Sequence, residues 1–151
     1  MDMIPMNTAN PTNDQTPHLD DISDLPVSQW VEAIDDIGEE TGYFEPLGPD
    51  HCVMFGDRSS QLLVTFETYE SITERSDNGL PIGHTMAEKH DWSHLTIIAH
   101  ADDIKSHWFR THYIYGYFDR LVEEGFFEDF DTVVFYGAGA SGYAASAYSV
   151  A

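Results

Sequence analysis

The chain has 151 residues, enough for one domain with a real core and too few for two ordinary domains. Its 27 acidic and 6 basic residues give a formal net charge of −21, which repels nucleic acid and anionic membranes, so neither is expected as a partner. Hydrophobic residues make up 42% of the chain and aromatic residues 13%, which predicts a folded rather than a disordered protein.

Residue counts also limit the metal and disulfide chemistry. The single cysteine, Cys52, excludes an intrachain disulfide and a cysteine-based zinc cage. His107 and His112 are five residues apart and do not share a helix face well, so they are predicted to be surface histidines. The N-terminus has neither Lys or Arg nor an apolar run of the kind found in secretory signals, and no stretch is apolar enough to span a membrane. We therefore expect a cytoplasmic protein.

The first elements along the chain are a leader and a helix. Residues 1–24 are polar and without periodicity, which predicts a disordered acidic leader, and the domain is expected over residues 25–151. A helix is predicted over Pro26–Glu40, with Ser28 as its cap and Gly42 just beyond its end. Its apolar positions recur on one face: Trp30, Ile34 and Ile37.

Three short runs then have strand composition: Tyr43–Leu47, His51–Phe55 and Gln61–Phe66. The breaks between them are rich in Gly, Pro, Asp and Ser, as turns are. Because these connections are short, we expect the three strands to pair in antiparallel fashion. Cys52 lies inside the second run, where a small buried hydrophobic residue is expected.

After Phe66 the pattern changes to an alternation of strands and helices. A polar stretch over Glu67–Gly83 comes first. The predicted elements then follow: a helix near 85–90, a strand at 95–99, a helix at 113–124, a strand at 132–136 and a helix at 144–151. This order is typical of a parallel sheet, so the predicted fold class is α/β.

A glycine-rich turn joins the last strand to the last helix. Glycines allow unusual backbone angles and close approach, and such a turn presents N–H groups at a helix N-terminus, where an anion is favoured. The backbone groups expected there belong to Gly137, Gly139, Ala140 and Gly142. The geometry is that of a nucleophile elbow or of a small-anion cradle, and the residues leave both interpretations open.

Ligands of such sheets bind outside the carboxyl ends of the strands. Three segments are expected to meet there: Glu67–Tyr69, His100–Asp103 and Gly137–Gly142. The candidate residues of this strand-end cleft are Glu67, Thr68, His100 and Asp102. A small molecule is the expected ligand, and its identity is open.

An antiparallel hairpin region that leads into strand, helix, strand, helix, strand and elbow resembles the first part of an α/β-hydrolase, over most of residues 43–151. The resemblance implies further strands carrying the acid and the histidine of a catalytic triad. These are absent here, so we expect a truncated domain. A sheet that ends at strand 132–136 leaves an open edge, through which the chain could self-associate.

Two registers match the turn to the hydrolase elbow. Without gaps, Gly137 is its first glycine and the nucleophile position falls on Gly139, which has no side chain. Shifting by two makes Ser141 the catalytic nucleophile but puts Tyr143 where a small residue is needed. We favour the first register, and with it a binding or accessory role; the negative charge of Glu67 would also oppose an oxyanion. The alternative is a serine esterase or acyl hydrolase using Ser141.

The segment after strand 95–99 resembles the A-H-P-D-D-E motif of zinc-dependent N-acetylglucosaminyl deacetylases. That resemblance implies that His100 and one of the two aspartates, Asp102 or Asp103, bind the metal. The other aspartate would then be the base that activates a water. Ala101 and Ile104 depart from the motif, and chance similarity in an Asp-rich chain explains it better. We therefore expect neither a metal nor another cofactor, and keep zinc-dependent deacetylation as an alternative.

A closer resemblance is to an alphaproteobacterial family often labelled phosphoadenosine phosphosulfate reductase. It rests on five stretches: Leu62–Thr68, Trp92–Leu95, Trp108–Arg110, Tyr115–Arg120 and Phe135–Ala145. The label implies a nucleophilic cysteine and a Ser-Gly-Gly-Lys-Asp-Ser type nucleotide loop, and neither is visible in this chain. Reduction of phosphoadenosine phosphosulfate is therefore a weaker alternative.

Overall fold

The computed structural model describes residues 21–101, 104–137 and 140–149. Its strands are β1 (Gly42–Pro46), β2 (His51–Gly56), β3 (Gln61–Thr68), β4 (Ser93–Ala99) and β5 (Thr132–Tyr136). Its helices are α1 (Val27–Thr41), α2 (Tyr69–Arg75), α3 (Ile82–His90), α4 (His112–Glu123) and α5 (Ala140–Tyr148), with short 3₁₀ turns η3 (Ile104–Trp108) and η4 (Phe126–Asp129). The α/β class predicted from the sequence is confirmed.

The five strands form one open mixed sheet in the order β1-β2-β4-β3-β5. β3 lies parallel to both β4 and β5, as the alternating pattern predicted. The antiparallel pairing predicted for the first three strands holds for β1 and β2 but is wrong for β2 and β3, because β4 lies between them. Every residue of β4 is buried, so this strand belongs at the centre of the sheet rather than at an edge.

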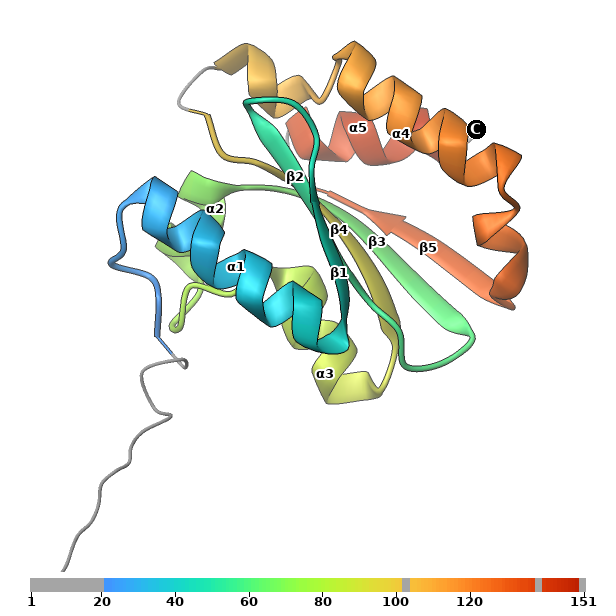
Figure 1. Cartoon of the computed structure of the whole chain (residues 1–151), viewed down its shortest axis with the longest axis horizontal. Coiled ribbons are helices and arrows are strands. Elements are labelled where there is room, and N and C mark those ends of the chain that lie inside the picture. Colours follow the sequence, from blue (N-terminus) through green and yellow to red (C-terminus); the bar gives the residue numbers. More distant parts are fainter. Residues whose placement is uncertain (1–20, 102–103, 138–139, 150–151) are drawn as a thin grey trace, which may run out of the picture.

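Helices cover both faces of the sheet (Figure 1). α1, α2 and α3 lie on one face, and α4 and α5 lie on the other. The alternation along β2 shows how the strands serve both layers: Cys52 and Met54 pack with Trp30 of α1, while Val53 and Phe55 join the core under α4 and α5. Phe66 of β3 is central to that second core.

Several helix assignments differ from the prediction. α1 is preceded by Pro26 and has no side-chain cap, so the predicted Ser28 cap is wrong. α2 lies within the stretch described from the sequence only as polar. The Thr68 hydroxyl caps this helix by accepting a hydrogen bond from the Ser71 N–H at 3.1 Å. α5 begins at Ala140, four residues earlier than predicted.

The predicted leader over residues 1–24 lies mostly outside the described residues. Within its described part, Ile22 is buried in the core that contains Trp30, and its N–H donates to the carbonyl of Asn78. The ordered domain therefore begins at least as early as Ile22, because this apolar side chain is covered by the α1 layer. None of the helices in the described ranges has the length and apolarity needed to cross a lipid bilayer.

Candidate functional site

A cavity of about 490 Å³ lies at the carboxyl end of β3. Its walls come from α2, the start of α3, η3, the end of β5 and the start of α5. The polar side chains that line it include Glu67, Thr68, Ser71, Arg75, Asn78, Thr85, His107 and Ser141. The structure thus brings Glu67 and Thr68 together with Ser141, as expected for segments that meet at the carboxyl ends of parallel strands.

Glu67 is a buried carboxylate that caps a helix distant in sequence. Its Oε1 accepts a hydrogen bond from the Ile82 N–H at 2.8 Å, and its Oε2 accepts from the Gly83 N–H at 3.0 Å and the Thr65 hydroxyl at 2.7 Å. α3 has no side-chain cap of its own at Pro81, so Glu67 supplies it. Burial raises the pKa of the Glu67 carboxyl, and the three donors counteract that shift.

The glycine turn brings the end of β5 against the first turn of α5. A Cβ atom placed on Gly137 would lie 2.1 Å from the Ser141 carbonyl oxygen and 2.9 Å from the Gly142 nitrogen. A Cβ on Gly142 would lie 3.1 Å from the Gly137 carbonyl oxygen. Position 137 therefore has no room for a side chain, and position 142 is tightly packed. Gly139, the predicted nucleophile position, lies outside the described residues.

Ser141 is the second residue of α5, and only 7% of it is exposed. It lines the cavity from the helix and does not lie in the segment that joins β5 to α5. Ala140, one of the predicted backbone groups, is the first residue of the same helix. The structure therefore places Ser141 in the wall of the strand-end cavity, within the first turn of α5.

His107, predicted to be a surface histidine, is half-buried and lines this cavity from η3. Its Nε2 lies 3.5 Å from the Glu70 Oε1 of α2. Both atoms are buried, and neither has a hydrogen-bond partner among the described residues. Nothing in the local sequence links these two residues, which are brought together by the packing of η3 and α2 around the end of β3.

His100 follows β4 but does not line the cavity, so its predicted place in the strand-end cleft is wrong. Its N–H donates to the Asp50 carbonyl at 2.9 Å, because β4 pairs with β2 and the end of one strand meets the start of the other. Burial lowers the pKa of the His100 imidazole. Asp102 and Asp103 lie outside the described residues. Among the described residues, no group of three His, Cys, Asp or Glu side chains is placed to hold a metal ion.

Cys52 is buried in β2, as predicted. Burial raises the pKa of its thiol to about 12. The thiolate is the nucleophilic form of cysteine, so burial disfavours reaction of Cys52 near neutral pH.

A chain of buried polar groups continues from Glu67 into the interface between α3 and the sheet. The Thr65 hydroxyl lies 3.2 Å from that of Thr96, and the Thr96 hydroxyl lies 2.9 Å from Nδ1 of His94. Gly83 rests directly on the two threonine hydroxyls, where a Cβ would come within 2.4 Å of Thr96 Oγ1. Burial lowers the pKa of His94 to about 3, with a smaller contribution from nearby His84.

His94 is expected to make the protein acid-sensitive. The unfolded chain binds this proton near pH 6.5, whereas the folded protein binds it near pH 3, so the unfolded state holds more protons between these values. Stability from neutral His94 is present above pH 6.5 and falls as the pH falls, by about 2 kcal/mol at pH 5. The measurement is urea unfolding of wild type and His94→Asn at about pH 7.5 and pH 5.

The raised pKa of Glu67 changes stability with pH in the opposite direction to His94, but it does so equally in wild type and in His94→Asn. The difference between the two proteins therefore isolates the effect of His94. His90→Asn, at an exposed position of α3, is the control and should keep the wild-type pH dependence. An equal loss of stability in wild type and His94→Asn would contradict the prediction.

A comparison with known proteins finds no match: no family model, no curated protein and no solved structure is matched by the chain.

Proposed function

We propose that the chain is an α/β-hydrolase-like domain that lacks the serine nucleophile and serves as a cytoplasmic binding or accessory protein for a small molecule. The order of elements supports the fold: an antiparallel hairpin, then β3, β4 and β5 in parallel with helices between them, a glycine turn and α5. The cavity at the carboxyl end of β3 is the proposed binding site.

The close approach across the glycine turn carries this proposal. In a nucleophile elbow, the reactive residue projects from a sharp turn between strand and helix, so the residues on either side of it must be small. Gly137 lies against the backbone of Ser141 and Gly142, as the two flanks of an elbow do. Residue 139 is midway in sequence between residues 137 and 141, so this contact favours the register that puts residue 139 at the nucleophile position. Residue 139 is glycine and has no side chain that could attack a substrate.

The hydrogen bonds of Glu67 support the same conclusion. Acyl transfer needs backbone N–H groups aimed at the developing oxyanion. The N–H groups of Ile82 and Gly83, at the start of α3, already donate to Glu67. The Glu67 carboxylate lines the same cavity, and its negative charge would repel an oxyanion there.

The lining favours a small polar ligand. The volume of about 490 Å³ is within the range of small-molecule sites. Hydroxyl and amide groups of Ser71, Asn78 and Thr85 provide donors and acceptors, and Phe66 and Ile72 provide apolar walls. A ligand that combines hydroxyl or amide groups with a short carbon skeleton suits this surface.

Binding at this cavity is testable by thermal shift with a panel of small polyols, amides and hydroxy acids. Thr85→Trp places a bulky ring at the exposed rim of the cavity, and we expect it to abolish any ligand-induced rise in melting temperature. Lys89→Trp, on the same helix but outside the cavity lining, should leave that rise unchanged. Equal responses in both variants would place binding elsewhere.

A second candidate, a serine esterase using Ser141, is favoured by one specific observation. Ser141 and His107 line the same cavity, and Glu70 lies 3.5 Å from His107. In such an enzyme, His107 would take the serine proton as Oγ bonds to the acyl carbon and would return it to the departing alcohol, while Glu70 would hold the imidazole. Water would then release the acyl group.

A fluorophosphonate probe separates the two candidates. We expect no labelling of the wild-type protein, because the residue at the proposed apex is glycine. Labelling that is lost in Ser141→Ala and in His107→Gln, but kept in His112→Gln, would establish the esterase and refute the binding role. Mass spectrometry of the labelled peptide checks the position directly.

A further inference from the structure

β5 is one edge of the sheet that the described residues form. It pairs with β3 on one side, and no other described segment pairs with it (Figure 1). Its sequence, Thr-Val-Val-Phe-Tyr, contains neither a charged residue nor a proline. Charged residues and prolines are what usually protect an edge strand from pairing. The opposite edge, β1, contains both, since it carries Glu45 and Pro46. Glu45 there also accepts a 2.7 Å hydrogen bond from Arg120.

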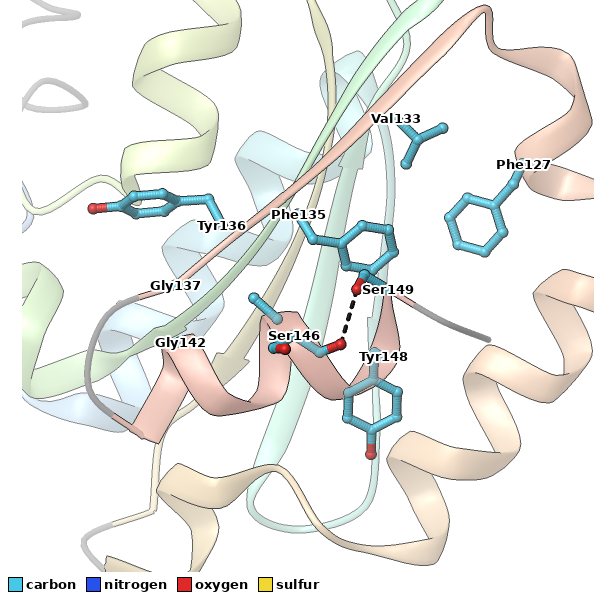
Figure 2. Close-up of a pocket in the computed structure, with 10 residues that line it drawn as sticks. Phe127, Val133, Phe135, Tyr136, Gly137, Gly142, Ser146, Tyr148 and Ser149 are labelled. Carbon is cyan, nitrogen blue, oxygen red and sulfur yellow. Dashed lines mark hydrogen bonds between the residues drawn. The ribbon is translucent and has the colours of Figure 1, made fainter.

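An uncharged groove of about 530 Å³ lies beside this edge, between β5 and α5 (Figure 2). Val133, Phe135 and Phe127 form its apolar wall, and Gly142 and Ala145 of α5 form a floor of small residues. None of the groove residues is charged, in a chain of net charge −21. On the other face of the strand, Val134 is 52% exposed and Tyr136 is 45% exposed.

We propose that β5 pairs with β5 of a second copy of this chain, in antiparallel fashion around a two-fold axis at Val134. The N–H and C=O groups along the outer side of β5, which no described segment pairs with, form a ready template for another strand. A two-fold axis at Val134 sets Thr132 opposite Tyr136 of the second copy and Val133 opposite Phe135 of the second copy. Pairs of β-branched and aromatic residues are favourable across strands, and no like charges meet.

Charge and shape both favour a second copy at this edge. Two chains that each carry −21 repel one another, and that repulsion is least where both surfaces are uncharged. Val133 and Phe135 of the second copy would extend the apolar wall of the groove beside Gly142 and Ala145. The inference is independent of the proposed small-molecule site, which lies at the carboxyl end of β3.

Sedimentation velocity over a series of protein concentrations, at low and high salt, tests the proposal. We expect a reversible dimer that strengthens with salt, because salt screens the repulsion between the two acidic chains. Val134→Lys sets two lysines opposite each other at the axis and should weaken dimerisation by about tenfold or more. Val122→Lys makes the same change at an exposed valine of α4 and should dimerise as wild type does.

Hydrogen exchange of the wild-type protein gives a second measurement that needs no variant. The outward amides of β5 should become protected as the dimer forms. A monomer at every concentration and salt level would overturn the proposal, as would equal dimerisation of the two lysine variants. Protection of β5 in a monomer would show that another segment covers the edge, and a dimer without that protection would show that another face pairs.

Discussion

Gly137→Ala is expected to lower the free energy of unfolding by about 3 kcal/mol or more. The new Cβ would lie 2.1 Å from the Ser141 carbonyl oxygen and 2.4 Å from its carbonyl carbon. Both are backbone atoms at the start of α5, so no side-chain rotation can relieve the clash. The end of β5 and the helix must move apart instead, which disturbs the core around Ala145 and Tyr148.

Gly116→Ala is the matched control for this substitution. Gly116 lies inside α4, and a Cβ placed there meets nothing within 4 Å. Alanine is a better helix former than glycine, so this variant should be more stable than wild type by about 0.5–1 kcal/mol. Urea unfolding of both variants checks the prediction, and equal stability of the two would be inconsistent with the close approach at the turn.

Glu67→Ala is expected to be similarly severe, with a loss of about 3 kcal/mol or more in the free energy of unfolding. This substitution removes the carboxylate that accepts three hydrogen bonds. The donors that lose this acceptor are the N–H groups of Ile82 and Gly83 and the hydroxyl of Thr65. Each buried donor left unpaired costs about 1–3 kcal/mol. Chemical denaturation gives the magnitude, and hydrogen exchange at the start of α3 locates the damage.

Two variants test whether the loss of stability in Glu67→Ala comes from the hydrogen bonds of Glu67. Glu67→Gln keeps the volume and one acceptor oxygen, so its loss should be smaller than that of alanine. Glu70→Ala removes a nearby carboxylate whose contact is with His107, and it should cost less than about 1 kcal/mol. If Glu70→Ala were as damaging as Glu67→Ala, the capping of α3 would not explain the role of Glu67.

These stability experiments also bear on function. A severe loss of stability in Gly137→Ala, with a small gain in Gly116→Ala, would support the register in which the apex of the turn carries no side chain. The same turn stands between the cavity at the end of β3 and the groove beside β5, since Gly137 lines the groove and Ser141 lines the cavity. Damage there should therefore weaken both ligand binding and pairing of β5.

The elements with strong local patterns were predictable from the sequence. The spacing of Trp30, Ile34 and Ile37 predicts α1, and the β-branched and aromatic run Thr132–Tyr136 predicts β5, because side-chain periodicity directly reflects which face is buried. The glycines after β5 also predict the sharp turn into α5, since few other residues tolerate such an approach.

Only the tertiary structure decided which strands are neighbours and which side chains share a site. Short connections favoured pairing of β2 with β3, yet β4, more than thirty residues farther along the chain than β2, lies between them, because strand pairing depends on burial of whole faces. The same nonlocal packing joins His107 to Glu70 and makes Glu67 the cap of α3. It also leaves His100 outside the lining of the cavity, because pairing of β4 with β2 carries the end of β4 to Asp50.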